Sequence, residues 1–188
     1  KILVAAGRRP QIEGLGLAEA GVEIDSGGWV QVDDRYATTA PGVFAAGDVI
    51  GPFGLASTAM EQARVAVCHA FGFEYKKETD RFRPTYIFSI PEAAWVGFTE
   101  EQARASGIEY QVGRSSFGTN AKARISGFSD GLVKLVFRVP DKVLLGVHIV
   151  GELATELVHI GQFVMHESGT IDRFIDATFA VPTRSEAY

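Results

Sequence analysis

The segment between Pro41 and Val49 carries the clearest chemical signal in the sequence. It reads Pro-Gly-Val-Phe-Ala-Ala-Gly-Asp-Val, so an apolar run is followed at once by Gly47 and by the carboxylate of Asp48. Ligands of α/β sheets bind beyond the carboxyl ends of the strands, and a glycine there lets a ligand approach the backbone closely. Asp48 could accept hydrogen bonds from the hydroxyls of a sugar or polyol. The residues alone leave a second interpretation open, in which Asp48 only caps a turn.

The residues after Asp48 predict a helix that would add polar groups to such a site. The pattern favours a helix over 56–70, begun by a capping box of Thr58 and Glu61 and ended by Gly72. A helix N-terminus presents unpaired N–H groups and the positive end of the helix dipole. The sequence contains no Gly-x-Gly-x-x-Gly, the loop that cradles a pyrophosphate. These residues therefore predict only half of a nucleotide-binding site.

The composition is that of a folded globular protein without a surface for nucleic acid. The chain has 188 residues, of which 46% are hydrophobic and 22% charged, which is enough for a core and too apolar for disorder. Lys and Arg number 18 against 23 Asp and Glu, a net charge of −5, so no basic face for nucleic acid is expected. No apolar run reaches the roughly 18 residues of a membrane helix, so no membrane partner is expected either.

The cysteine and histidine residues do not predict a metal site. The single cysteine, Cys68, cannot form an intramolecular disulfide or a multi-cysteine site, and its use is typical of the reducing cytoplasm. We expect Cys68 to be buried on a helix. His159 and His166 share a predicted helix face without a third ligand nearby, so packing or an interface explains them better than a metal. His148, inside a predicted strand, is expected to be a structural histidine with satisfied hydrogen bonds.

The chain divides into two parts joined by a charged linker. Residues 72–83 are polar and charged, and they separate a piece of a dinucleotide-binding region (1–71) from a second domain (84–188). The apolar run at 1–6 is typical of a buried parallel strand. The other elements expected in the first part are a short helix at 13–19 and strands at 29–32 and 43–46.

The second domain is predicted to combine an antiparallel sheet with helices on one side, which makes the fold class α+β. A hairpin is indicated by Val139-Pro-Asp-Lys142 between two apolar strands. A helix over 152–168 carries an apolar stripe of Leu153, Leu157, Ile160 and Val164. The other expected elements are a helix from the Thr99 cap to Gly107 and strands at 85–89, 93–97, 109–117, 131–138 and 143–150.

The two ends of the sequence predict a piece of a longer protein. The first residue is Lys1, not Met, and the strand signal begins at once. The last residues include Thr183 and Glu186, a Thr-x-x-Glu signature of a helix start, without the helix that it announces.

Five motifs in the same order resemble the pyridine nucleotide-disulfide oxidoreductases, the flavoprotein reductases with two dinucleotide-binding domains. The resemblance covers nearly the whole chain and identifies it as the second flavin-binding segment and the dimerisation domain of such a protein. It implies FAD and NAD(P) as cofactors, small-molecule nucleotides as ligands, and a homodimer formed through the C-terminal domain. The five motifs lie at Val4–Pro10, Pro41–Val49, Gly51–Ser57, Pro84–Gly97 and Ala180–Ala187.

The same resemblance assigns roles to six residues of the first part. Asp48 matches the acid that binds the flavin ribityl chain, and Gly47 matches the glycine that permits the approach. Leu55 and Ala56 match positions whose backbone N–H groups meet the O2 edge of the flavin, where negative charge grows on reduction. Gly7 and Arg8 match a segment near the bound nicotinamide nucleotide. An ordinary turn with solvated arginines is the alternative for that segment.

Val181 departs from the family pattern and indicates the subfamily. The dithiol and disulfide reductases carry a histidine there, which shuttles a proton to the substrate thiol and is oriented by the downstream glutamate. Val181 cannot move a proton, so we expect Glu186 to cap a helix and expect no catalytic residue in this chain. Residues 178–188 and 156–162 resemble the soluble pyridine nucleotide transhydrogenases, which pass hydride between NADPH and NAD through FAD.

Three other functional interpretations remain open. A mercuric reductase-like enzyme also lacks the histidine, and a dihydrolipoamide dehydrogenase-like reductase shares the other motifs. A dimerisation module without catalysis is a third possibility, because the pyrophosphate loop is absent from the sequence. For that reason the isolated chain is expected to be inactive and to retain flavin poorly, whichever enzyme it belongs to.

Overall fold

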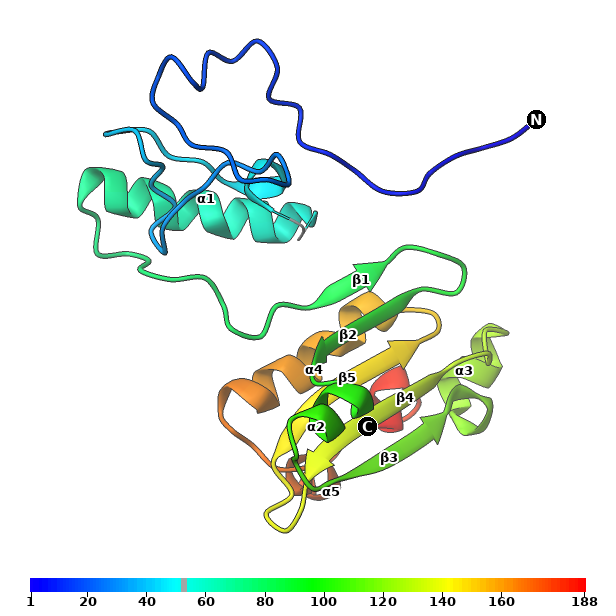
Figure 1. The fold of residues 1–188 in the computed structure, drawn as a ribbon. Coiled ribbons are helices and arrows are strands. Elements are labelled where there is room, and N and C mark those ends of the chain that lie inside the picture. The colour runs from blue at the N-terminus through cyan, green and yellow to red at the C-terminus, as the bar shows by residue number, and fades with distance from the viewer. Residues whose placement is uncertain (52–53) are drawn as a thin grey trace. The chain divides into compact units, whose positions relative to one another are not determined.

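A computed structural model describes residues 1–51 and 54–188 of the chain. They form two compact units, Lys1–Arg81 and Phe82–Tyr188 (Figure 1). Each unit has its own core. Within the described ranges, no helix is both long enough and apolar enough to cross a lipid bilayer.

The first unit is built around one long helix. Its backbone outside that helix forms turns and isolated antiparallel bridges, which pair Ile24 with Val30, Val32 with Thr38 and Ala37 with Phe44. A small core of Val22, Val30 and Ala40 holds these turns together. The helical elements of this unit are the 3₁₀ helix η1 (Gly47–Ile50) and the helix α1 (Ala56–Phe71).

The predicted strand at 1–6 does not form. Ile2 and Leu3 are more than 90% exposed, and residues 1–6 pair with no strand among the described residues (Figure 1). A parallel strand needs hydrogen-bonded neighbours at its edges, and an apolar run without them stays extended. The runs at 29–32 and 43–46 likewise make only the single bridges described above.

The prediction of a short helix at 13–19 is also wrong. The segment forms turns, and the N–H of Ala20 donates to the carbonyl of Gly16 at 3.0 Å. Gly14 and Gly16 both have a left-handed backbone, with φ of 77° and 65°. A right-handed helix cannot pass through two such residues, so the segment turns instead.

Helix α1 confirms its predicted position but begins differently. It ends at Gly72, whose φ of 69° gives the expected left-handed C-terminal cap. Its N-cap is Leu55, without a side-chain cap, so the predicted capping box is wrong. Thr58 is instead buried within the helix, and Glu61 forms ion pairs with Lys76 and Arg64. The hydrogen bond from Lys76 lowers the pKa of Glu61.

The second unit is a five-stranded sheet in which all neighbouring strands are antiparallel, as predicted. Its strand order is β1-β2-β5-β4-β3. The strands are β1 (Thr85–Ile87), β2 (Ala93–Gly97), β3 (Tyr110–Ser116), β4 (Leu132–Arg138) and β5 (Leu144–Val150). The helical elements are α2 (Glu100–Ala105), η2 (Phe117–Thr119), α3 (Ala121–Ser126), α4 (Ala154–His166), α5 (Asp172–Asp176) and η3 (Arg184–Ala187).

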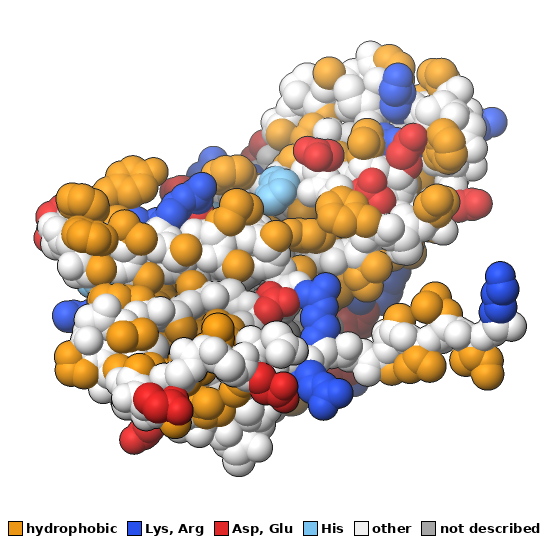
Figure 2. All heavy atoms as spheres, turned by 90° about the horizontal axis from the view of Figure 1, so that it is seen from above, with side chains coloured by type: hydrophobic (Ala, Val, Ile, Leu, Met, Phe, Trp, Pro, Cys, Tyr) orange, Lys and Arg blue, Asp and Glu red, His pale blue; other side chains and the backbone are white. Residues whose placement is uncertain are grey.

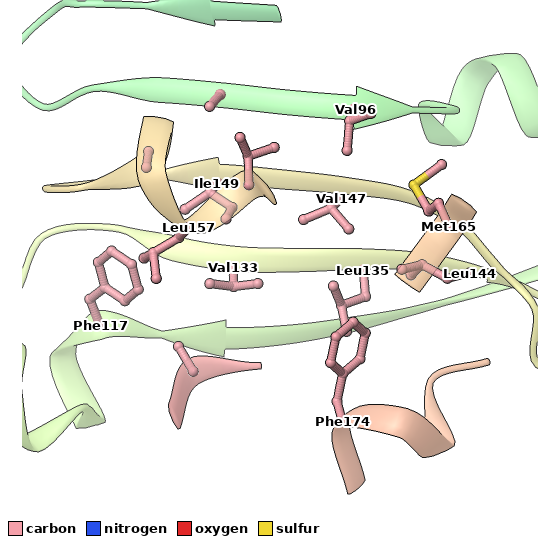
Figure 3. Close-up of a cluster of buried hydrophobic side chains, with 14 of the residues drawn as sticks. Val96, Phe117, Val133, Leu135, Leu144, Val147, Ile149, Leu157, Met165 and Phe174 are labelled. Carbon is pink, nitrogen blue, oxygen red and sulfur yellow. The ribbon is translucent and has the colours of Figure 1, made fainter. Parts of the chain in front are cut away.

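The main core lies between the sheet and α4. Val133 and Leu135 of β4 and Val147 of β5 face Leu157 and Met165 of α4 (Figure 3). Because side chains alternate along a strand, the other residues of these strands face away from α4. The short helix α2 covers part of that second face with a smaller apolar cluster of Ala103, Val136 and Leu145 (Figure 1).

The predicted apolar stripe of α4 is rotated from the buried face that the structure shows. Leu153 is the N-cap, with a φ of 64° and a side chain that is 46% exposed. Ile160 and Val164 are partly buried at the edge of the core. The stripe assumed a helix that began at residue 152, whereas the helix begins at Ala154, two residues later. The buried positions are Ala154, Leu157, Val158, Gly161 and Met165.

The second face of the sheet carries a row of polar side chains. His148 lies between Trp95 of β2 and Lys134 of β4. Lys134 and Arg114 both donate to the Glu100 carboxylate, at 3.1 and 2.8 Å. Both ring nitrogens of His148 are buried without a hydrogen-bond partner among the described residues, so the expectation of satisfied hydrogen bonds is wrong. Burial, followed by the charge of Lys134, lowers the pKa of His148 to about 4.

The C-terminal residues are fixed to the second unit by three groups. The N–H of Thr183 donates to Glu186 at 2.9 Å, as the predicted capping role requires. The buried guanidinium of Arg184 pairs with Glu152 and donates to the Ser126 hydroxyl and to the carbonyl of Phe128. The hydroxyl of the C-terminal tyrosine donates to the carbonyl of Leu157 in α4 at 2.7 Å.

Candidate functional site

The first unit contains an open pocket next to Asp48, which we call the Asp48 pocket. Its volume is about 540 Å³. It lies where η1 follows the last bridge of the unit, close to the start of α1. Its lining residues are Gly7, Arg8, Arg9, Trp29, Asp48, Gly51 and Gly54.

An ion pair crosses this pocket. Arg8 Nη1 lies 2.7 Å from Asp48 Oδ2, and the same nitrogen is 3.5 Å from the carbonyl oxygen of Gly54. The side chains of Arg8 and Asp48 are 72% and 49% exposed. Water screens such an exposed pair, which is worth at most about 1 kcal/mol. A ligand that offers better hydrogen bonds to Asp48 can therefore displace Arg8 at little cost.

Gly47 is required by the packing of η1 against α1. Its φ is 83°, and a Cβ there would lie 3.1 Å from the Cβ of Ala59. Its N–H donates to the buried side-chain oxygen of Gln62 at 2.7 Å. The glycine predicted to permit the approach of a ligand thus fixes η1, and with it Asp48, against the helix.

Gly54 keeps the space above the ion pair open. A Cβ at this position would lie 3.1 Å from Arg8 Nη1 and 3.3 Å from Asp48 Oδ2. Both distances are shorter than ordinary van der Waals contact, so a side chain would push against the charged pair. The backbone at Gly54 can therefore approach a ligand held by Asp48.

The structure brings together some of the predicted site residues but not all of them. Gly7, Arg8 and Asp48 line one pocket. Leu55 and Ala56 do not line it; they form the N-cap and first residue of α1, which has no side-chain cap. The motif at 51–57 includes residues 52 and 53, which lie outside the described residues.

The predicted site residues do not include four residues that line the pocket: Arg9, Trp29, Gly51 and Gly54. Arg9 was grouped with solvated arginines, and Trp29 was treated as part of a strand. No spacing rule connects residues 20 positions apart in a segment of irregular turns, so only the folded structure could reveal that they meet.

Two family models together match most of the chain. The pyridine nucleotide-disulphide oxidoreductase dimerisation domain matches residues 83–188, and the pyridine nucleotide-disulphide oxidoreductase model matches residues 1–69. The chain belongs to this family of oxidoreductases, as the motifs predicted. The family implies the use of flavin and of nicotinamide nucleotides.

Curated proteins similar to this chain include several named soluble pyridine nucleotide transhydrogenase. One from Mycobacterium tuberculosis (strain ATCC 25177 / H37Ra) is 45% identical over 187 residues, which cover 100% of this chain and 40% of that protein. One from Vibrio atlanticus (strain LGP32) is 41% identical over 190 residues, covering 100% of this chain and 41% of that protein. The chain thus spans about 40% of the length of these relatives.

Solved structures of flavoproteins share the fold of the chain. The HOCl-induced flavoprotein disulfide reductase of Escherichia coli aligns with a TM-score of 0.90 and 29% identity, over 97% of this chain and 42% of that one. LpdA from Mycobacterium tuberculosis aligns with a TM-score of 0.86 and 30% identity, over 97% of this chain and 40% of that one.

Proposed function

We propose that this chain is part of an FAD-dependent NAD(P) oxidoreductase that passes hydride between NADPH and NAD, as a soluble pyridine nucleotide transhydrogenase. The observation that carries the proposal is the 41–45% identity over the whole chain to proteins of that name. The flavin, when bound, would accept hydride from one nucleotide and return it to another. The chain itself would contribute part of the grip on the flavin.

In this proposal Asp48 accepts hydrogen bonds from the ribityl hydroxyls. Three features of the pocket support that role: the carboxylate is half exposed, its partner Arg8 is easily displaced, and Gly54 leaves room above the pair. An ionised carboxylate makes strong hydrogen bonds with hydroxyl groups. Gly7 and Arg8 would then lie near the bound nicotinamide nucleotide.

The first turn of α1 would stabilise the reduced flavin electrostatically. Among the described residues the N-cap Leu55 has no side-chain cap hydrogen bond, and the helix is 16 residues long. The positive end of its dipole favours negative charge on the O2 edge of the ring. These residues thus bind and orient, and they supply no proton.

Val181 supports hydride transfer over thiol chemistry. Its aliphatic side chain is 74% exposed and cannot hold a proton. Glu186 is occupied by the N–H of Thr183, so it is a poor substitute for the missing base. The fold shared with a flavoprotein disulfide reductase makes a reductase of mercuric or dithiol type the alternative that must be tested.

We also propose a homodimer formed through residues 84–188. The match to a dimerisation domain supports it, and so do large exposed side chains such as Phe163, Ile175 and Val181, each at least 70% exposed. Figure 2 shows hydrophobic side chains on the face of the chain that is seen there, and contiguous exposed apolar surface is typical of protein interfaces. The single cysteine supports a location in the reducing cytoplasm.

The test uses the full-length protein that contains this chain. Asp48→Ala should lower the flavin bound per subunit, because the ribityl hydroxyls lose a charged acceptor worth about 1.5–3 kcal/mol. Asp34→Ala is the matched control, since Asp34 is an exposed carboxylate of the same unit away from the pocket. Unchanged flavin content in Asp48→Ala would refute the role given to Asp48.

A further inference from the structure

We infer that Gln62 is a positioning residue of the proposed flavin site. Its side chain holds the Gly47–Asp48 turn on helix α1, so that the carboxylate of Asp48 lies at a fixed place relative to the start of the helix. The inference rests on the proposed function and deepens it. It assigns Gln62 no contact with a ligand, because only 6% of the residue is exposed.

Gln62 is a polar residue on the buried face of α1. The helix runs over Ala56–Phe71, and Thr58 and Val65 are buried on the same face, at spacings of one helical turn. Burying the amide of a glutamine costs free energy unless the amide finds a hydrogen-bond partner. Here the side-chain oxygen accepts from the N–H of Gly47.

The hydrogen bond from Gly47 is short, and both of its partners are buried. The distance from Gly47 N to Gln62 Oε1 is 2.7 Å. The two residues are 15 positions apart in the sequence, so the bond is a tertiary contact between η1 and α1. Without the acceptor the N–H of Gly47 would remain buried and unpaired, which is costly for a backbone donor. The conformation of this turn therefore depends on Gln62.

A packing contact one helical turn away supports the same arrangement. Gly47 has a φ of 83°, and a Cβ there would lie 3.1 Å from the Cβ of Ala59. The backbone of η1 therefore packs directly on α1. Ala59 and Gln62 are neighbours on the helix surface, so two contacts hold Gly47 on the helix. Asp48 is the next residue, and its position follows from that of Gly47.

The hydrogen bond connects the two groups that are proposed to bind the flavin. Asp48 would bind the ribityl hydroxyls, and the first turn of α1 would face the O2 edge of the ring. At about 1.5 Å per residue, Gln62 lies roughly 9 Å along the helix from Ala56. Groups that contact two parts of one ligand bind it best when their separation is set before the ligand arrives. Gln62 thus lowers the ordering cost of binding and adds no contact of its own.

The experiment titrates the flavin-free full-length protein with FAD and follows flavin fluorescence. Gln62→Met removes the acceptor and nearly keeps the length of the side chain, whereas Gln62→Glu keeps an acceptor oxygen. Cys68→Ala is the matched control, since Cys68 is buried further along the same helix. We expect Gln62→Met to raise the dissociation constant of FAD about tenfold, the effect of losing one hydrogen bond. Gln62→Glu should restore most of the affinity, and Cys68→Ala should lower stability without changing it.

Combination with Asp48→Ala separates positioning from a general loss of stability. If Gln62 acts through Asp48, Gln62→Met should change the dissociation constant little in the Asp48→Ala background, because the carboxylate that it positions is gone. A tenfold loss in both backgrounds would overturn the inference, as would a Gln62→Glu protein that binds FAD no better than Gln62→Met.

Hydrogen–deuterium exchange at the Gly47 amide provides a readout that does not depend on flavin. We expect this amide to exchange slowly in the flavin-free parent, because its hydrogen bond to Gln62 is already formed. Gln62→Met should accelerate the exchange about tenfold or more, and Cys68→Ala should not. Fast exchange in the parent, which needs no variant to be folded, would overturn the inference.

The outcomes separate this inference from the proposed function. Weak FAD binding by Asp48→Ala with normal binding by Gln62→Met would reject the inference alone. Normal binding by Asp48→Ala would reject the role of Asp48 and the inference with it. The expected binding and exchange results, in an enzyme that passes no hydride between the nucleotides, would reject the proposed function and leave the positioning role of Gln62 in place.

Discussion

Removal of the Tyr188 hydroxyl tests how the C-terminal residue is joined to the core. The hydroxyl donates to the carbonyl of Leu157 at 2.7 Å and accepts from the N–H of Gly161 at 3.3 Å. It therefore lies beside a hydrogen-bonded turn in the middle of α4. The ring packs against Phe174, with ring centroids 4.8 Å apart. Tyr188→Phe keeps that ring contact and removes both hydrogen bonds.

The expected cost follows from the quality of the two hydrogen bonds. The bond to Leu157 is short and partly buried, and such a bond contributes about 1 kcal/mol net. The longer bond from Gly161 adds less. We therefore predict that Tyr188→Phe lowers the free energy of unfolding by about 1–2 kcal/mol, which in a domain of this size is a fall in melting temperature of about 4–8 °C. The Leu157 carbonyl keeps an intrahelical partner, so a larger loss is not expected.

The assay is thermal and urea unfolding with Tyr75→Phe as the matched control. Tyr75 is 84% exposed, so its variant should stay within about 0.5 kcal/mol of the parent. A Tyr188→Phe chain as stable as the control would refute the claim that this hydroxyl fixes the C-terminus.

Tyr188→Phe should also change how the stability of the chain depends on pH in the alkaline range. Burial raises the pKa of Tyr188 above its ordinary value of 10.0. The unfolded chain loses this proton near pH 10 whereas the folded chain retains it, so this contribution to stability is present below pH 10 and is lost as the pH rises beyond it. Tyr188→Phe should remove that loss, and the difference between parent and variant should shrink above pH 10. A constant difference from pH 8 to pH 11 would contradict the burial argument.

Three further changes test other parts of the structure. Arg184→Ala should cost about 1–3 kcal/mol, because the Ser126 hydroxyl and the Phe128 carbonyl lose their buried partner, while water can solvate the partly exposed Glu152. Arg184→Met, which fills the space, should cost less in urea unfolding. Acid should destabilise the second unit by about 1–2 kcal/mol between pH 6.5 and 4, because His148 is protonated in the unfolded chain but not in the folded one. His148→Gln should reduce this loss of stability, as measured by urea unfolding at a series of pH values. Glu186→Gln should lower the melting temperature of the full-length enzyme but leave its hydride-transfer rate within about twofold, since Glu186 caps Thr183; a large loss of rate would contradict the capping role.

The strands of the second unit were predictable because each carries its own signal. Val133 and Leu135 alternate with polar or oppositely facing residues, and β2 has the bounds that the pattern gave. The predicted helix start at Thr99 is confirmed, and Gln102 completes a capping box there. Local turn chemistry and period-two alternation suffice when the partner strands are close in sequence.

The first unit was predicted less well because its signals depend on distant partners. The run at 1–6 has the composition of a buried strand, but composition cannot supply neighbouring strands. The left-handed backbone conformation of two glycines prevents the helix expected at 13–19 from forming. The short helices α3 and α5 were missed, since five or six residues give too little periodicity to recognise.

The candidate site, too, could be predicted only where its residues are contiguous in the sequence. Asp48 and Gly47 were found from a strand followed by Gly-Asp, a contiguous motif. Arg9 and Trp29 were not, because their proximity is created by turns. The burial of Arg184 was equally invisible, since arginine is rarely buried and its partner Glu152 is 32 residues away in the sequence.

The most direct test of the proposed function is the rate of hydride transfer from NADPH to an NAD analogue by the full-length enzyme, measured beside its reduction of lipoamide. The account predicts rapid, flavin-dependent transfer between the nucleotides and little reduction of lipoamide, because Val181 cannot relay a proton. Rapid reduction of lipoamide, or no transfer between the two nucleotides by the flavin-loaded enzyme, would contradict it.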